Sequence, residues 1–218
     1  MENQNKLIQK RRIIKYFIYA AIELIDEGGL SNVTIRKIAD KAGYNSATIY
    51  NYFENLDHLL LYVAINNLNE YIDALPSYIK YAKNSKEIYI GVWHSFIDYA
   101  LLKPDLYYKL FISDLKGNVN SYFDEYYKLF PIDIKKYPDV IRSMLKSSNI
   151  LDRNKILMDD CIKEGLVSEE NGKIIHDLSV SIFESTMIRI NNGALTTGKA
   201  KDRFLNYLDL FFKEFGND

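Results

Sequence analysis

The segment TIRKIADKAGYNSATIYNYF, residues 34–53, has the pattern of two short helices separated by a glycine. Thr34 is a suitable N-cap for a first helix, because its side-chain oxygen can accept a hydrogen bond from a free backbone N–H. That helix carries Ile38 on its apolar face and ends near Ala42. Gly43 follows, and glycine accepts the backbone angles that a sharp turn requires. The segment therefore predicts a helix, a turn and the start of a second helix.

The second helix is expected to begin after Asn45 or Ser46 and to run through Ile49 to Phe53. Ile49 and Phe53 are spaced to pack inward, while the remaining positions are polar or aromatic. The outward side chains are Ser46, Thr48 and Asn51, with Tyr50 as a further one. A short helix that is polar outside and apolar behind can enter the major groove of DNA, so the pair predicts a helix-turn-helix.

Helical periodicity continues on both sides of this segment. Apolar residues recur every three or four positions over residues 6–27: Ile14, Phe17, Ile18, Ala21, Leu24 and Ile25. The pair Gly28-Gly29 is expected to end this helix, and Asn55 is expected to cap a further helix that starts at Leu56-Asp57.

The residues 34–53 resemble the DNA-binding signature of the tetracycline-repressor (TetR) family. That signature runs roughly Thr-x-x-x-Ile-Ala-x-x-Ala-Gly, then Thr-Leu-Tyr-x-Tyr-Phe, and the similarity extends over about residues 10–62. The resemblance implies a bacterial, homodimeric, ligand-responsive regulator, expected to be a repressor that a small apolar or aromatic effector releases from a palindromic double-stranded DNA operator. The residues that it assigns to DNA binding are Thr34, Arg36, Lys37, Tyr44, Asn45, Ser46, Thr48, Tyr50, Asn51 and Tyr52. Packing within the domain is the alternative for Tyr52, and plain solvation is the alternative for Asn51.

Three positions depart from the family pattern. Tyr44 stands where a small or β-branched residue is usual, Ser46 where a basic residue or proline is frequent, and Leu56 where a phosphate-binding lysine is expected. A missing cation weakens DNA binding and its salt dependence. An alternative hypothesis is therefore a helical protein that binds a ligand or partner and whose DNA-binding domain is vestigial.

The rest of the chain predicts an all-α protein with two domains, a helix-turn-helix domain at 1–55 and a larger ligand-binding and dimerisation domain at 56–218. Proline and polar stretches divide the second part, and Pro104 suits the first turn of a helix. The expected helices are 56–82, 85–102, 105–115, 120–130, 138–147, 150–164, 172–192 and 199–215, with a loop at 131–137.

Aromatic residues are concentrated between residues 62 and 130. Filling of the core and the surface is the interpretation for most of them. Buried tyrosine hydroxyls need partners, however, so this many phenols also favour a pocket for an apolar or aromatic ligand over a dry core. By the family resemblance, the residues expected to line that pocket are Trp93, Phe96, Tyr99, Tyr107 and Phe111. Few ionic groups lie among them, which favours a neutral ligand. Four residues are candidates for a polar contact to the ligand, and the sequence does not rank them: Asp98, Arg142, Arg153 and Arg189.

The last two predicted helices carry broad apolar stripes that must be buried somewhere. Packing on their own domain is one alternative. The resemblance favours the other, a four-helix bundle between two copies of the chain, which two-fold recognition of a palindrome requires. The residues expected at this dimer interface are Ile175, Leu178, Ile182, Phe204, Leu208 and Phe212.

Composition excludes several other classes. The 218 residues carry a net charge of −1, with +2 in residues 1–55 and −3 in the remainder. No apolar stretch predicts a membrane span or a signal peptide, and the single Cys161 forms no internal disulfide, so a cytoplasmic protein is expected. His58, His94 and His176 are far apart, which predicts no metal site and no cofactor. No nucleophile or paired acid and base predicts catalytic residues, so an all-helical enzyme is the least favoured hypothesis.

Overall fold

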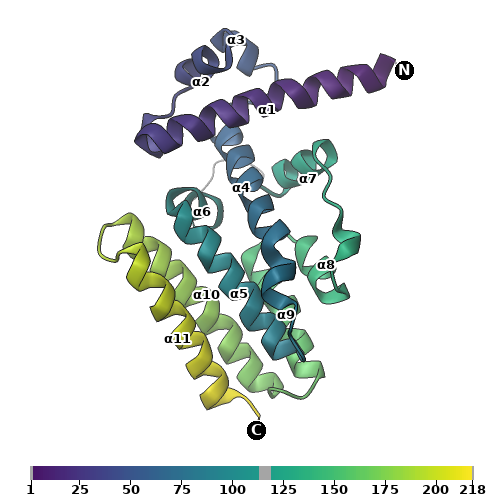
Figure 1. Cartoon of the computed structure of the whole chain (residues 1–218), viewed down its shortest axis with the longest axis vertical. Helices are drawn as coiled ribbons and strands as arrows, with labels where there is room; N and C mark the ends of the chain where they lie inside the picture. Colours follow the sequence, from purple (N-terminus) through teal and green to yellow (C-terminus); the bar gives the residue numbers. More distant parts are fainter. Residues whose placement is uncertain (1, 113–118, 218) are drawn as a thin grey trace. The chain divides into compact units, whose positions relative to one another are not determined.

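The computed structural model describes residues 2–112 and 119–217, and its described secondary structure is helical, without a strand (Figure 1). This confirms the all-α prediction. The elements are α1 (Glu2–Gly28), η1 (Leu30–Asn32), α2 (Ile35–Ala42), α3 (Ser46–Ile49), α4 (Leu56–Ile79), α5 (Ser85–Leu102), α6 (Pro104–Phe111), α7 (Val119–Leu129), η2 (Ile134–Lys136), α8 (Asp139–Leu145), α9 (Ile150–Lys163), α10 (Glu169–Asn191) and α11 (Thr197–Phe215).

Most predicted helix boundaries agree with these within three residues, and residues 113–115 of one predicted helix lie outside the described residues. Three boundaries differ by four residues: α1 begins at Glu2 rather than residue 6, α6 ends at Phe111 rather than residue 115, and α3 ends at Ile49 rather than Phe53. The backbone N–H groups of Asn51 and Tyr52 donate to the carbonyl oxygens three residues earlier, Thr48 and Ile49. These tighter bonds replace the α-helical pattern, so the chain leaves the helix one turn early.

The chain divides into two compact units. The N-terminal unit consists of the described residues through Leu68 together with α7 and the residues that follow it to Ile132. The C-terminal unit consists of Asn69–Ile112 and the described residues from Asp133 onward. This geometric division passes through α4, whereas the sequence prediction places a domain boundary between residues 55 and 56, which stays a prediction.

Phe17 of α1 is at the centre of the N-terminal unit. Its ring contacts those of Tyr44, Tyr52 and Phe53, with centroids 5.2, 6.1 and 6.3 Å away. Phe17 and Phe53 are buried, as the apolar spacing predicts. Burying rings of this size stabilises the unit by about 1.5–3 kcal/mol each. Phe17 therefore fixes α1 against the turn and the segment that follows α3.

Aromatic rings also join α7 to the first part of α4. The imidazole of His58 stacks on Tyr122 at 4.1 Å, and Tyr62 meets Tyr126 edge-on at 5.2 Å. The hydroxyl of Tyr126 donates to Asn66, 3.3 Å away. Much of the aromatic concentration in the sequence therefore serves the interior of the N-terminal unit.

The C-terminal unit is a helical bundle around a second aromatic core. In it α10 packs against α6, α9 and α11, while α5 packs against α9 and α11 (Figure 1). Trp93 and Phe96 of α5 meet Phe183 of α10, and Trp93 also meets Phe204 of α11, with centroids 5.1–5.9 Å apart. All four rings are buried. The core thus lies between α5 and the last two helices.

Gly91 of α5 lies where this helix packs closely against the end of α4. A Cβ atom at this position would lie 2.8 Å from the backbone oxygen of Tyr78. We predict that Gly91→Ala lowers the free energy of unfolding by about 1–3 kcal/mol, because backbone must shift to relieve the overlap. Urea denaturation of the full chain measures this change in the free energy of unfolding.

Gly198 of α11 provides the control, because a Cβ atom at this position would have no atom within 4 Å. Gly198→Ala should raise stability by about 0.4–1 kcal/mol through reduced chain entropy. Equal stabilities of the two variants would contradict the close packing of α5 on the end of α4.

Candidate functional site

The helix-turn-helix of the N-terminal unit is held by the caps that its sequence predicts. The Oγ1 atom of Thr34 accepts a hydrogen bond from the N–H of Lys37, 3.2 Å away, at the start of α2. Gly43 adopts the left-handed conformation, with φ 76° and ψ 27°. The Oδ1 atom of Asn45 accepts from the N–H and the hydroxyl of Thr48, both at 2.9 Å. These contacts fix the direction in which α3 leaves the turn.

Most residues predicted to bind DNA are accessible. Tyr50 is 59% exposed, and the exposed Asn51 lies next to it. The other exposed members are Thr34, Arg36, Lys37 and Asn45, while Ser46 and Thr48 are half-buried. Tyr50 directly follows α3, so a large flat side chain with a hydroxyl is presented at the end of this capped helix. Such a side chain can reach a phosphate or a base edge.

Tyr44 and Tyr52 are half-buried, and both rings pack on Phe17. The sequence left packing open as the alternative for Tyr52, and the ring of Tyr52 packs in this way. Tyr44 does the same, which explains why a large residue stands where the family pattern has a small one: its ring adds to the interior of this unit.

The basic side chains of α2 differ in how strongly they are held. Lys41 pairs with Glu27 at 2.7 Å and Glu23 at 3.1 Å, and its hydrogen bonds to these two carboxylates raise its pKa. Lys37 donates to the backbone oxygen of Asn32, 3.1 Å away. Among the described residues, Arg36 makes only a long, exposed contact of 3.9 Å with Asp40. Because exposed pairs of this kind contribute little, Arg36 can exchange its partner for a phosphate.

The C-terminal unit contains a small, mostly apolar cavity of about 30 Å³. Its lining comes from α4, α5, α6, α8 and α9: Tyr71, Val92, Trp93, Phe96, Phe111, Met144, Ile150, Arg153, Asn154 and Leu157. Of the five residues predicted to bind ligand, Trp93, Phe96 and Phe111 line it. Tyr107 is buried behind them, 5.4 Å from Phe96, and the half-buried Tyr99 also lies outside the lining.

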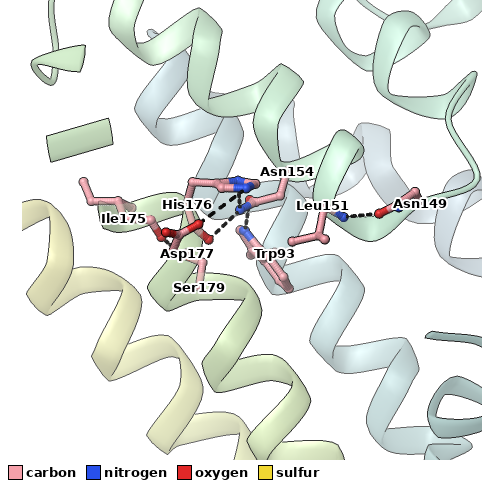
Figure 2. A network of polar contacts seen from close by, with 8 residues as sticks. All are labelled: Trp93, Asn149, Leu151, Asn154, Ile175, His176, Asp177 and Ser179. Atoms are coloured by element: carbon pink, nitrogen blue, oxygen red, sulfur yellow. Dashed lines mark hydrogen bonds and ion pairs between the residues drawn. The ribbon is translucent and has the colours of Figure 1, made fainter. Parts of the chain in front are cut away.

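A polar network crosses the interior beside this cavity (Figure 2). Trp93 Nε1 donates to Asn154 Oδ1 at 2.9 Å. The Nδ2 atom of Asn154 in turn lies 2.9 Å from Nδ1 of His176 and donates to the His176 carbonyl oxygen at 3.1 Å. Burial lowers the pKa of His176, so its imidazole is neutral and Nδ1 accepts from Asn154. No sequence pattern identified this network, because its three members come from α5, α9 and α10.

The predicted dimer residues divide into two groups. Ile175, Phe204, Leu208 and Phe212 are at most 3% exposed within the chain itself. Fully buried side chains offer no area to a partner, so these four belong to the interior of the C-terminal unit, contrary to the expectation. Leu178 and Ile182 are half-buried and remain accessible.

The accessible face of α10 is defined by a different set of residues, which we call the α10 stripe: Ile174, Leu178, Ser181, Ser185 and Ile188. Their spacing of four and three residues places them on one side of the helix. None of the five is buried in the chain.

Other chemistries find little support in the described part of the chain. No cluster of potential metal ligands occurs among the described residues. Within the same ranges, no helix has the length and apolar character needed to cross a membrane. Cys161 is buried, and burial raises the pKa of its thiol to about 11, which keeps it protonated at neutral pH.

Comparisons with known proteins match both units. Residues 17–63 match the family model for bacterial regulatory proteins of the tetR family. The chain is 34% identical over 79 residues to the fatty acid metabolism regulator protein of Bacillus subtilis (strain 168), a match that covers 36% of this chain. It spans only 41% of that relative's length.

Solved structures resemble nearly the whole chain. The structure of RolR with resorcinol has a TM-score of 0.60 and 16% identity, over 97% of this chain and 90% of that one. The structure of Thermus thermophilus FadR, a TetR-family transcriptional repressor, with lauroyl-CoA has a TM-score of 0.57 and 14% identity, over 89% and 92%. At these identities the similarity establishes the fold.

The His176 contact predicts a pH dependence of stability. The pKa of His176 lies below its ordinary value of 6.5 in the folded chain. As the pH falls below that value, the unfolded chain takes up a proton that the folded chain resists. The free energy of unfolding therefore decreases from about pH 6.5 downward, by about 1.4 kcal/mol per unit of pKa difference.

Thermal unfolding of the chain and of His176→Gln checks this dependence. The melting temperature of the wild type should fall more steeply between pH 7.5 and 5.5 than that of the variant, whose amide can still accept from Asn154 but does not titrate. Burial also lowers the pKa of His58, but this contribution is the same in the wild type and in the variant. Between pH 7.5 and 8.5 the two curves should be parallel, and parallel curves at every pH would refute the assignment.

Proposed function

We propose that this chain, which belongs to the TetR family of bacterial regulatory proteins, is a ligand-responsive transcriptional regulator that binds double-stranded DNA through α2 and α3. One observation carries the proposal: the exposed Tyr50 and Asn51 follow a capped α3 whose direction is fixed by Gly43 and Asn45. A short helix presented in this way suits the major groove, and helix N-termini favour phosphates.

Repression is the mode of action that we propose. In this mechanism an effector in the cavity of the C-terminal unit binds more tightly to a conformation that cannot hold the operator. DNA binding then falls by the ratio of the effector's affinities for the two states. RolR with resorcinol and FadR with lauroyl-CoA are relatives in fold whose structures contain ligands.

A second candidate is a ligand-binding helical protein with weak DNA binding. Leu56, half-buried at the start of α4, takes the place of the lysine that the family uses on phosphate, and Lys41 is engaged by two glutamates. The salt dependence of DNA binding separates the two candidates, because each lost phosphate contact lowers its slope by about one. Absence of DNA binding even at low salt would favour the second.

Tyr50 and Asn51 provide the test of the proposed interface. We predict that Tyr50→Ala and Asn51→Ala each weaken binding by about tenfold, the effect of losing one good contact to a base. Fluorescence anisotropy with duplexes from the region upstream of the chain's own gene, at several salt concentrations, measures the affinity.

Tyr81→Ala is the matched control, because Tyr81 is 79% exposed and lies in the C-terminal unit. Its affinity should equal that of the wild type. If all three variants bind equally well, α3 does not carry the DNA contact and the proposal fails.

We further propose that the regulator is a homodimer that joins through the α10 stripe. Ile174 and Ile188 are 37% and 40% exposed, and the two serines between them allow helices to approach closely. A two-fold dimer would place two α3 helices in successive major grooves about 34–36 Å apart on a palindrome.

Leu178→Glu tests this interface, because a charge in the middle of an apolar contact loses its hydration without gaining a partner. Analytical ultracentrifugation should show a dimer for the wild type and a monomer for the variant. Leu151→Glu, at a leucine of α9 that is 46% exposed, should remain dimeric. A dimeric Leu178→Glu would exclude the stripe.

A further inference from the structure

The charged and amide side chains of the cavity in the C-terminal unit come from two neighbouring residues of α9. Arg153 and Asn154 both line the cavity, together with aromatic residues such as Trp93, Phe96 and Phe111. Arg153 is 5% exposed and Asn154 is 2% exposed. A charge and an amide this deep in an apolar interior are costly unless their hydrogen bonds are made.

Asn154 is already engaged within the chain. Its Oδ1 atom accepts from Trp93, and its Nδ2 atom contacts both Nδ1 and the carbonyl oxygen of His176 (Figure 2). These contacts use both ends of the amide. Asn154 therefore serves to join α5, α9 and α10, and it has little capacity left for a ligand.

Arg153 is engaged at one end only. Its Nε atom donates to the backbone oxygen of Ser147, 2.7 Å away, which fixes the orientation of the guanidinium. The Nη1 and Nη2 atoms are buried and have no hydrogen-bond partner among the residues that the structure describes. The guanidinium is thus oriented by one contact while its outer donors remain available.

The buried Tyr107 hydroxyl, near enough for the charge of Arg153 to act on it, also lacks a partner in the described ranges. Burial raises the pKa of Tyr107 well above its ordinary value, so the hydroxyl keeps its proton and can donate. Tyr107 lies outside the lining, and in this protonated form it adds no negative charge that could neutralise Arg153 from behind. The positive charge of Arg153 and its free N–H donors favour an anion over a neutral molecule.

We propose that the ligand of this cavity is an organic monocarboxylate, whose carboxylate binds the Nη1 and Nη2 atoms of Arg153 and whose aromatic or apolar body packs on Trp93 and Phe96. This inference rests on the proposed ligand response and names its ligand class. It replaces the neutral ligand that the sequence favoured. A guanidinium presents two parallel N–H donors, and a carboxylate presents two acceptors at matching separation.

The size of the cavity adds a requirement. A volume of about 30 Å³ holds one or two water molecules, so the body of the ligand must displace side chains. Phe111, at the end of α6, is the one lining residue that is not buried. The ring of Phe111 is therefore the side chain that the ligand replaces.

Trp93 is the only tryptophan in the sequence and lines the cavity, so its fluorescence reports binding directly. The probes are two matched pairs, benzoate with benzamide and octanoate with octanamide. In the wild-type full chain each carboxylate should bind about 10- to 100-fold more tightly than its amide, the ratio expected for hydrogen bonds to a charged group. Arg153→Met should bind both members of a pair equally.

Lys155→Met is the matched control, because Lys155 lies on the same helix but is exposed and pairs with Asp159 at 2.6 Å. It removes the same charge and should keep the preference for carboxylates. The ligand-free Arg153→Met chain should melt at or above the wild-type temperature, since it loses a buried charge without a partner. A purely structural arginine would instead lower the melting temperature when replaced.

Three results would overturn the assignment: amides that bind as tightly as the carboxylates, an Arg153→Met chain that keeps the preference, or no fluorescence change with any of the four probes at millimolar concentration. The comparison in the wild type holds even if Arg153→Met fails to fold.

DNA binding is measured on the same preparations. Carboxylate binding without any effect on DNA would refute the regulatory role alone, and DNA binding without a carboxylate preference would refute the anchor alone.

Discussion

The side-chain amide of Asn154 is the contact on which the interior of the C-terminal unit depends. It joins α5 through Trp93 and α10 through His176, and it lies itself on α9. Because both ends of the amide are used, the three helices are held in one arrangement around the aromatic core. The neighbouring Arg153 also lines the cavity, and its Nη1 and Nη2 atoms have no hydrogen-bond partner among the described residues. Of these two adjacent residues, Asn154 has its hydrogen bonds made within the chain and joins the helices, whereas Arg153 keeps free donors that a ligand can use.

The N-terminal unit is organised differently, around an apolar ring instead of a polar contact. The ring of Phe17 packs against the rings of Tyr44, Tyr52 and Phe53. These contacts hold the turn and the segment after α3 against α1. The rings of Tyr44 and Tyr52 pack on Phe17 and so cannot stack on or contact DNA. Tyr50 is the tyrosine of residues 34–53 that remains exposed. Packing thus selects which of several similar residues can act in recognition.

The correction of the predicted dimer interface has a simple physical cause. An apolar stripe on a helix predicts that the stripe is buried, but it does not identify the surface that buries it. Phe204, Leu208 and Phe212 satisfy that requirement inside their own unit, which leaves a different face of α10 accessible. The early end of α3 has a different, local cause: tighter backbone hydrogen bonds at Asn51 and Tyr52 replace the helix that the pattern predicts.

The sequence by itself determined the all-helical class, nearly all helix boundaries and the helix-turn-helix, because caps, glycine breaks and apolar periodicity act over a few neighbouring residues. Thr34, Gly43 and Asn45 each act within four residues of their own position. Only the tertiary structure decided that Arg153, one of four unranked polar residues, lines the cavity with free donors, and that Asn154 meets Trp93 and His176. Burial and partnership between residues 22 to 61 positions apart depend on how helices pack, and no local pattern encodes them.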